Sequence, residues 1–267
     1  MIYFIEGIMG IGKTTYARRL YQQLKEQGEE THIYFEHIAA NKLDFTRKAY
    51  VTPDQYRQIK KRYLAAVAGT FDEEHLRERF LQSTDLFKNG YLIAYTEWDL
   101  SNEQLKKLAY EIYHLEICNG NVTYEQYHDL ILQRWKEYFQ SIDCSKNHIF
   151  EGVLFQSILL DLIGNYVLSE QEILNFYHEL FQVFEKHEVK IIWIYTDQVA
   201  SVLAAANEQR QDGSGQWLLY FKDWLAKTPY GYEGADIFTE TMQNIEYLIL
   251  QNESADYLTI ERKCNDA

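Results

Sequence analysis

The chain has 267 residues, with 40 acidic and 26 basic side chains and a formal net charge of −14. This charge argues against a protein that binds nucleic acid or an anionic membrane, because both partners need a basic surface. Hydrophobic residues make up 46% of the chain, which provides a sizeable core, and no apolar run is long enough to span a bilayer. We therefore expect one large globular domain.

Three cysteines, Cys118, Cys144 and Cys264, are widely spaced and odd in number. They show neither metal-ligand spacing nor the pattern of a disulfide framework. The N-terminus already has the character of a core strand, so no signal peptide is expected before it. These features predict a protein of the reducing cytoplasm. The sequence leaves the oligomeric state open, a homodimer included.

The first fifteen residues have the pattern of a strand, a glycine-rich loop and a helix. Residues 1–5 form a short apolar run that suits a buried strand, and the helical pattern begins near Thr14. Between them the sequence fits the phosphate-loop pattern Gly-x-x-x-x-Gly-Lys-Ser/Thr, with a chance glycine turn as the alternative. The predicted nucleotide-binding residues are Gly7, Met9, Gly10, Ile11, Gly12, Lys13, Thr14 and Thr15.

The residue types of this loop match the chemistry of phosphate binding. Glycines let consecutive backbone N–H groups curl around phosphate oxygens, where a Cβ would obstruct the approach. The helix that starts near Lys13 directs its positive end toward the same phosphates. We expect Lys13 to reach the β- and γ-phosphates of ATP and the Thr14 hydroxyl to ligate Mg²⁺.

A second strand is predicted over residues 31–36, after a helix that ends near Gly28. A strand, a helix and another strand within about forty residues form a βαβ unit, so the sheet is expected to be parallel. Ligands of open parallel sheets bind beyond the carboxyl ends of the strands. Glu36 is therefore well placed for chemistry, although a strand-end carboxylate with a structural partner is an equally good interpretation.

Residues 41–145 are predicted to be a mostly helical insertion that covers the site of the acceptor. Capping patterns mark several helix starts in it, and residues 91–96 fit a strand and a helix equally well. The predicted helices span residues 53–68, 72–82, 101–117 and 123–140.

A third strand over residues 148–152 ends on Glu151 and a glycine. In phosphate-loop proteins a strand of this kind ends on an acid that meets Mg²⁺, so Glu151 is the second predicted metal ligand. A capping or loop carboxylate is the alternative. Helices over 169–187 and 197–210 then flank a fourth strand over 189–196, whose nearly continuous apolar character suits a central parallel strand.

A lid is predicted over about residues 208–228, where glycines flank a polar stretch beside Arg210. An arginine that closes on a transferring phosphoryl group stabilises the charge on its oxygens, so Arg210 is the predicted lid cation. A solvated surface arginine is the alternative. A helix over 235–250 and a fifth strand over 256–261 complete the chain.

These pieces resemble the P-loop kinases of nucleosides and nucleotides, the deoxynucleoside kinase and thymidylate kinase group. The resemblance rests on the glycine loop directly after the first strand, Glu36, Glu151 and the Arg210 region, and only the loop is a specific motif. It implies a three-layer α/β fold with a five-stranded parallel sheet of order 2-3-1-4-5, ATP as donor and a closing lid. It also implies that Glu36 is the base that accepts the proton of an acceptor hydroxyl.

The sequence departs from that family at two places. His37 follows Glu36 where those kinases usually have proline, and Gly152-Val153 follows Glu151 where they have Arg-Ser. These departures leave the identity of the acceptor open. We expect a small molecule, with a nucleoside or nucleotide favoured and another compound such as an antibiotic as the alternative. A P-loop ATPase or nucleotide-binding switch without a small-molecule acceptor is the alternative function.

Overall fold

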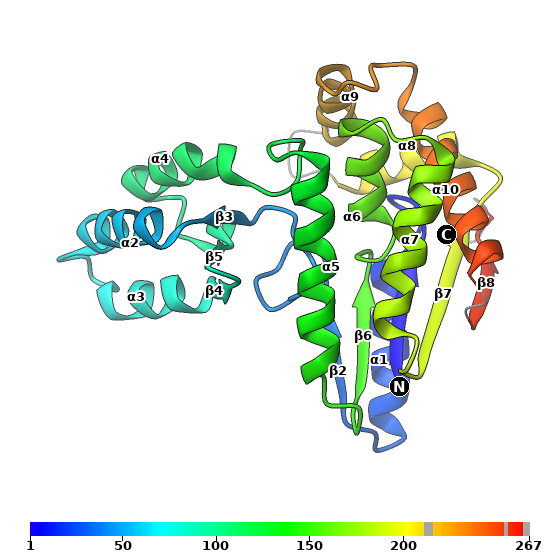
Figure 1. Ribbon diagram of the computed structural model, residues 1–267, viewed down its shortest axis with the longest axis horizontal. Helices are drawn as coiled ribbons and strands as arrows, with labels where there is room; N and C mark the ends of the chain where they lie inside the picture. The colour runs from blue at the N-terminus through cyan, green and yellow to red at the C-terminus, as the bar shows by residue number, and fades with distance from the viewer. Residues whose placement is uncertain (211–215, 254–255, 264–267) are drawn as a thin grey trace. The chain divides into compact units, whose positions relative to one another are not determined.

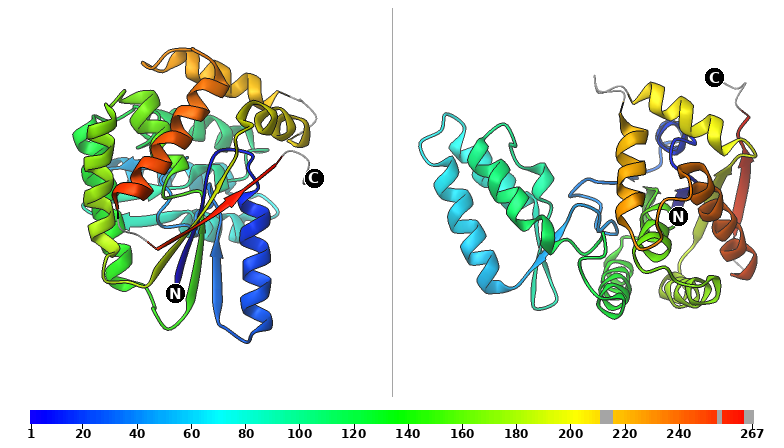
Figure 2. Two further views of the ribbon diagram at one scale, coloured as in Figure 1. Left: turned by 90° about the vertical axis from the view of Figure 1, so that its right-hand side faces the viewer. Right: turned by 90° about the horizontal axis from the view of Figure 1, so that it is seen from above.

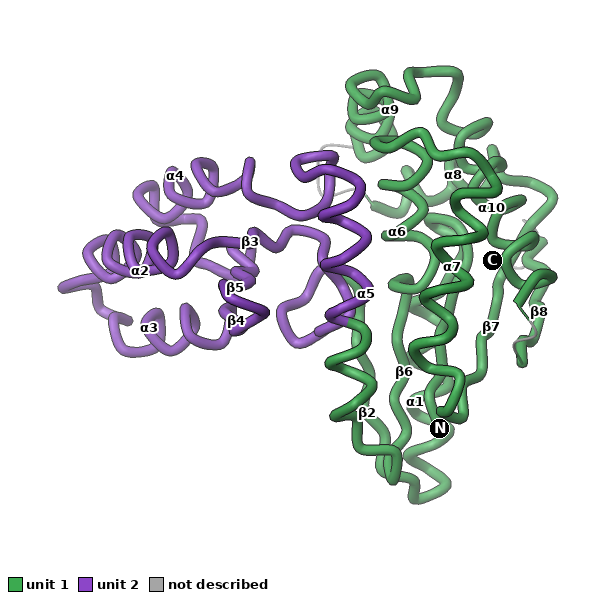
Figure 3. Tube along the Cα trace, viewed as in Figure 1, with its two compact units in different colours: residues 1–36, 135–267 green, residues 37–134 purple. Residues whose placement is uncertain are grey.

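The computed structural model describes residues 1–210, 216–253 and 256–263. The chain forms two compact units, one from residues 1–36 and 135–267 and the other from residues 37–134 (Figure 3). The second unit overlaps the insertion predicted over about residues 41–145. Residues 41–134 of the predicted insertion thus belong to a unit with a core of its own, whereas residues 135–145 belong to the first unit.

The first unit is built on a five-stranded parallel sheet (Figure 1). Its strand order is β2-β6-β1-β7-β8, which becomes 2-3-1-4-5 when the strands of this sheet are counted along the chain. The expected α/β class, the five parallel strands and their order are thus confirmed. The strands are β1 Ile2–Glu6, β2 Thr31–Tyr34, β6 Asn147–Glu151, β7 Val189–Tyr195 and β8 Tyr257–Glu261.

The strand register brings the carboxyl ends of three strands to one edge of the sheet. Ile5, near the end of β1, pairs with Glu151 on one side and with Ile192 of β7 on the other. All three strands run in the same direction, so the loops that follow them emerge together. This edge is where the sequence places its candidate site.

Helices cover both faces of this sheet, with α1 on one face and α7 and α10 on the other (Figure 2). Phe4 of β1 shows how the second face is filled, because its ring lies 5.6 Å from Trp135 and 5.8 Å from Phe184. The helices are α1 Lys13–Glu26, α6 Gln156–Leu159, α7 Glu170–Phe184, α8 Val199–Gln209, α9 Trp217–Lys227 and α10 Ala235–Asn252, with a π-helix at Leu160–Asn165.

The second unit packs helices against a three-stranded antiparallel sheet of order β3-β5-β4. The mostly helical prediction for this stretch missed the sheet, because strands of three or four residues carry too little periodicity to be recognised. Residues 91–93, which the sequence left undecided, belong to a strand. The elements are β3 Ala49–Val51, α2 Pro53–Val67, α3 Glu73–Gln82, β4 Thr84–Phe87, β5 Gly90–Ile93, α4 Glu103–Ile112 and two 3₁₀ turns, Tyr95–Glu97 and Tyr113–Leu115.

Helix α5 comprises Tyr124–Ser141, and its residues up to 134 belong to the second unit and those from 135 on to the first. Across the described ranges, no helix has both the length and the apolar composition needed to cross a membrane.

Candidate active site

The glycine loop leaves β1 through a position that only glycine fits. Gly7 has a φ of 133°, and a Cβ added there would lie 2.1 Å from the backbone oxygen of Ile194. A side chain at this position would collide with β7 and would also strain the backbone. The loop is therefore held close to the neighbouring strand from its first residue.

Lys13, the first residue of α1, is almost fully buried with 4% of its surface exposed. Its ammonium group donates to the backbone oxygens of Gly7 at 3.0 Å and Ile8 at 3.1 Å, and to Oε1 of Gln156 at 2.6 Å. These three acceptors match the three N–H groups of the ammonium. Gly12 is the N-cap residue of α1, and no side chain among the described residues caps this end of the helix.

Glu36 lies two residues beyond the end of β2 and reaches the same place. Its Oε2 accepts a 2.6 Å hydrogen bond from Nε2 of Gln156. A Cβ added to Gly152, which has a φ of 74°, would lie 3.0 Å from that oxygen and 3.2 Å from Cε of Lys13. The absence of a side chain at Gly152 therefore leaves room for Glu36 and Lys13 to approach each other.

Glu151, the last residue of β6, lies beside the start of α1. Thr14 Oγ1 donates to Glu151 Oε1 at 3.2 Å, with the carboxylate buried and the hydroxyl side exposed. Mg²⁺ commonly takes one or two protein oxygens and completes its shell with water and substrate phosphates. The pair of oxygens fits such an ion, although no larger cluster of metal-binding side chains occurs in the described ranges.

A cavity of about 220 Å³ joins these groups at the carboxyl edge of the sheet. It is lined by most of the predicted site residues, whereas Gly7, Met9 and Ile11 do not line it. Met9 and Ile11 turn buried side chains into the protein, so only their backbone atoms are available to a ligand. The lining residues are Gly10, Gly12, Lys13, Thr14, Thr15, Glu36, Glu151, Ala206, Gln209 and Arg210.

Arg210 follows the end of α8 and is exposed at the rim of this cavity. Its guanidinium carbon lies 4.4 Å from the ring centre of Trp217, the first residue of α9, in cation–π contact. The predicted lid spans about residues 208–228. Its residues 211–215 lie outside the described part of the chain, and most of the remainder is α9.

Two residues of the site were missed in the sequence, Gln156 and Arg262. Arg262 follows β8 and donates from Nη1 to the backbone oxygen of Gly10 at 2.8 Å. Neither residue belongs to a sequence motif. Each lies near the glycine loop because the strand before it, β6 or β8, belongs to the same sheet as β1. The only available signal was their place just after strands whose carboxyl ends were expected at the site.

Two fully buried acids lie near the loop on the α7 and α10 side. Glu6 accepts hydrogen bonds from the backbone N–H groups of Leu154 at 2.9 Å and Phe155 at 3.1 Å. Burial raises the pKa of Glu6 to about 8, although these two donors and the charge of Lys13 oppose the rise. Burial likewise raises the pKa of Glu246 to about 7, against a hydrogen bond from Trp193.

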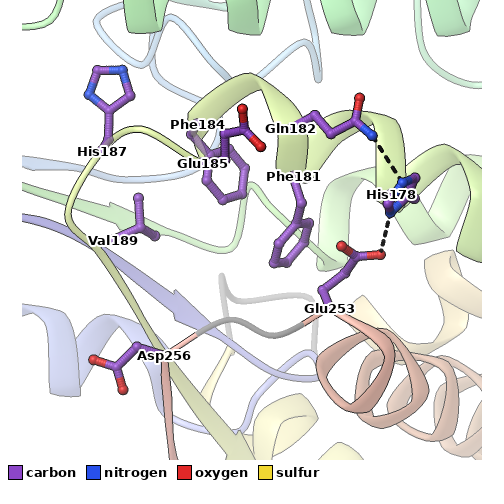
Figure 4. Close-up of a pocket in the computed structure, with 9 residues that line it drawn as sticks. All are labelled: His178, Phe181, Gln182, Phe184, Glu185, His187, Val189, Glu253 and Asp256. Carbon is purple, nitrogen blue, oxygen red and sulfur yellow. Dashed lines mark hydrogen bonds and ion pairs between the residues drawn. The ribbon is translucent and has the colours of Figure 1, made fainter.

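Larger cavities lie elsewhere in this unit, including one of about 370 Å³ near the amino ends of β7 and β8 (Figure 4). There Gln182 Nε2 lies 2.9 Å from His178, which lies 3.3 Å from Glu253. Glu185 and Asp256 also line it, so three carboxylates would repel a phosphate. The 220 Å³ cavity at the glycine loop is the better candidate for an anionic nucleotide.

Comparison of the sequence with protein-family models and with curated proteins gave no match. The functional assignment therefore depends on the residues of the site.

Proposed function

We propose that the protein is an ATP-dependent phosphotransferase with a P-loop kinase fold, and that it acts on a small molecule. A nucleoside or nucleotide is the acceptor class that we favour. One observation carries the proposal: a glycine loop after β1 presents Lys13 and Thr14 to a cavity that also contains Glu36 and Glu151 from two neighbouring strands. A site that only binds phosphate would have no use for a carboxylate such as Glu36 beside it.

The donor side of the reaction uses the glycine loop. Lys13 and the backbone N–H groups at the start of α1 would bind the phosphate oxygens of ATP. Thr14 and Glu151 would hold Mg²⁺, which neutralises phosphate charge when it is bound. Arg210 would add positive charge at the rim of the cavity, where negative charge accumulates during transfer.

The acceptor side uses Glu36. Its carboxylate would accept the proton of the acceptor hydroxyl while that oxygen forms a bond to the γ-phosphorus. The bond between the γ-phosphorus and the bridging oxygen breaks, and ADP leaves with the electron pair. Glu36 then releases the proton to solvent, which returns the site to its starting state.

The test is a transfer assay with γ-labelled ATP and Mg²⁺ over nucleosides, nucleotides and aminocyclitols. We expect one of these classes to be labelled by the native protein. Lys13→Ala should abolish ATP binding, because the buried cation that meets the phosphates is lost. Glu36→Gln should retain ATP binding and lose transfer, by about 10²–10⁴-fold for a general base.

Lys25→Ala, at an exposed position of the same helix, is the control for Lys13→Ala and should change neither property. Full activity of Glu36→Gln on the true acceptor would remove Glu36 from the role of base. ATP hydrolysis that no acceptor alters would favour an ATPase or nucleotide-binding switch over a kinase.

A further inference from the structure

The side-chain amide of Gln156 connects the two sides of the proposed reaction. Its Oε1 accepts from Nζ of Lys13 at 2.6 Å, and its Nε2 donates to Oε2 of Glu36 at 2.6 Å. Gln156 is the first residue of α6 and has only 4% of its surface exposed. One buried amide thus bridges the lysine of the donor side and the carboxylate of the acceptor side.

Lys13 has no N–H group left over for a phosphate in this arrangement. The backbone oxygens of Gly7 and Ile8 and the amide oxygen of Gln156 take one hydrogen bond each. A phosphate oxygen can bind the ammonium group only if one of these acceptors gives way. The carbonyls of Gly7 and Ile8 belong to the main chain and can move only with it, whereas the Gln156 side chain can rotate about its own bonds.

The loss of one hydrogen bond would affect the other, because both belong to the same planar amide. When Oε1 of Gln156 turns away from Lys13, Nε2 turns with it and leaves Glu36. The lone pair of Oε2 that accepted the hydrogen bond from Gln156 can then accept one from an acceptor hydroxyl. Gly152 keeps the space beside Glu36 Oε2 and Lys13 Cε free of a side chain.

We propose that Gln156 is a positioning residue that couples the two substrates: a bound triphosphate displaces it from Lys13 and thereby releases Glu36 for the acceptor. The inference deepens the proposed function and rests on it. With this coupling, the Glu36 carboxylate would keep its hydrogen bond to Gln156 until the triphosphate has bound. In this role Gln156 competes with the nucleotide for Lys13 and contributes no contact of its own to the phosphates.

The test compares the affinity of native protein and variants for the ATP analogue β,γ-imido-ATP with Mg²⁺ by titration calorimetry. Gln156→Met keeps the length of the side chain and removes both hydrogen bonds. We expect it to bind the analogue about tenfold more tightly, the change that corresponds to one charge-assisted hydrogen bond no longer broken on binding. A glutamine that merely supports the loop would give weaker binding in this variant.

A double-mutant cycle with Glu36→Gln separates coupling from simple removal of charge. Glu36→Gln replaces the charged acceptor of the Gln156 hydrogen bond by a neutral one and so weakens that bond. The substitution should tighten analogue binding in the native background, but much less in the Gln156→Met background. Equal effects in both backgrounds would mean that Glu36 acts through its charge alone, which would overturn the inference. If Gln156→Met does not fold, Gln156→Asn, which is too short to bridge both groups, serves the same purpose.

The outcomes distinguish the inference from the function on which it rests. If native protein fails to bind the analogue, the proposed function is wrong and the inference falls with it. If native protein binds the analogue and Gln156→Met binds no more tightly, the inference alone is overturned.

Discussion

Glu246 of α10 is a fully buried acid with an incomplete set of partners. Its Oε2 accepts a 2.7 Å hydrogen bond from Nε1 of Trp193, whereas Oε1 has no partner among the described residues. Glu246 interacts electrostatically with Lys13, Glu6 and Tyr177. A carboxylate in this position is easier to bury with its proton on, because the charged form loses its hydration.

This burial predicts a pH-dependent stability. The pKa of Glu246 is about 7 in the folded protein and 4.5 for the free side chain, so the folded state holds more protons between these values. The free energy of unfolding should therefore fall as pH rises from about 4.5 to 7, by on the order of 3 kcal/mol at most. Glu246→Gln removes this contribution, so we expect the Tm of the variant relative to native protein to be higher at pH 8 than at pH 5.

Glu240→Gln is the control, because that carboxylate is exposed on the same helix. Its Tm difference from native protein should be the same at both pH values. If the new amide in Glu246→Gln destabilises the protein independently of pH, it lowers the Tm equally at pH 5 and at pH 8. A Tm difference for Glu246→Gln that does not change between pH 5 and pH 8 would show that Glu246 is ionised in the folded protein.

Single residues of the site were predictable where a motif or a strand end marks them. The glycine loop marks Lys13 and Thr14, and the ends of two strands mark Glu36 and Glu151. Gln156 has no such mark, because its two hydrogen bonds span more than one hundred residues of chain. Its place depends on β6 lying between β1 and β2, which a local pattern does not encode.

At the scale of single elements, capping residues define the helix starts that the sequence predicts best. In α7 the backbone N–H of Ser169 donates to Glu172 Oε2 at 2.8 Å, and the Ser169 hydroxyl caps the backbone N–H of Glu172 in return. Thr52 and Gln55 form the same capping box at the start of α2. These signals lie within four residues, so they survive in the sequence without any tertiary information.

Ser169→Ala should therefore destabilise the protein through α7. Loss of the cap is expected to cost about 1 kcal/mol, or about 2–4 °C in Tm for a chain of this size. Ser201→Ala is the matched control, because Ser201 is exposed within α8 and alanine is the better helix former there. Thermal unfolding followed by circular dichroism measures both, and an equal loss in the two variants would contradict a role for the cap.

The three short strands of the second unit show the limit of element prediction. β3 has three residues and β4 has four, so neither contains enough alternation to be distinguished from a turn or a helix end. They become a sheet only because β5 pairs with both of them. Tertiary pairing, not local propensity, decides their structure.

At the scale of the whole molecule, each of the two units has its own buried core. The core of the second unit includes Phe80, whose ring lies 4.7 Å from that of Tyr63 and 6.0 Å from that of Trp98. The residues that line the candidate nucleotide cavity all belong to the first unit. Stability of the second unit and nucleotide affinity should therefore respond to different substitutions.

Phe80→Leu tests this separation. It should lower the free energy of unfolding by about 1 kcal/mol, because a smaller side chain leaves part of the core unfilled. The affinity for β,γ-imido-ATP with Mg²⁺ should stay within about twofold of the native value, since no residue that lines the candidate nucleotide cavity is changed. Urea unfolding and calorimetry measure the two quantities, and a tenfold loss of affinity would show that the second unit contributes to nucleotide binding.

The sequence by itself determined the features that local chemistry specifies. These are the glycine loop with Lys13, the parallel character of the sheet, the helix caps and the acids at the strand ends. Only the tertiary structure decided which distant groups meet: the amide of Gln156 between Lys13 and Glu36, Arg262 on the loop, and the buried Glu246. The physical reason is that hydrogen bonds and burial between distant segments depend on how side chains pack once the strands are paired, which short-range patterns do not record. The strand order itself was expected only through the family resemblance.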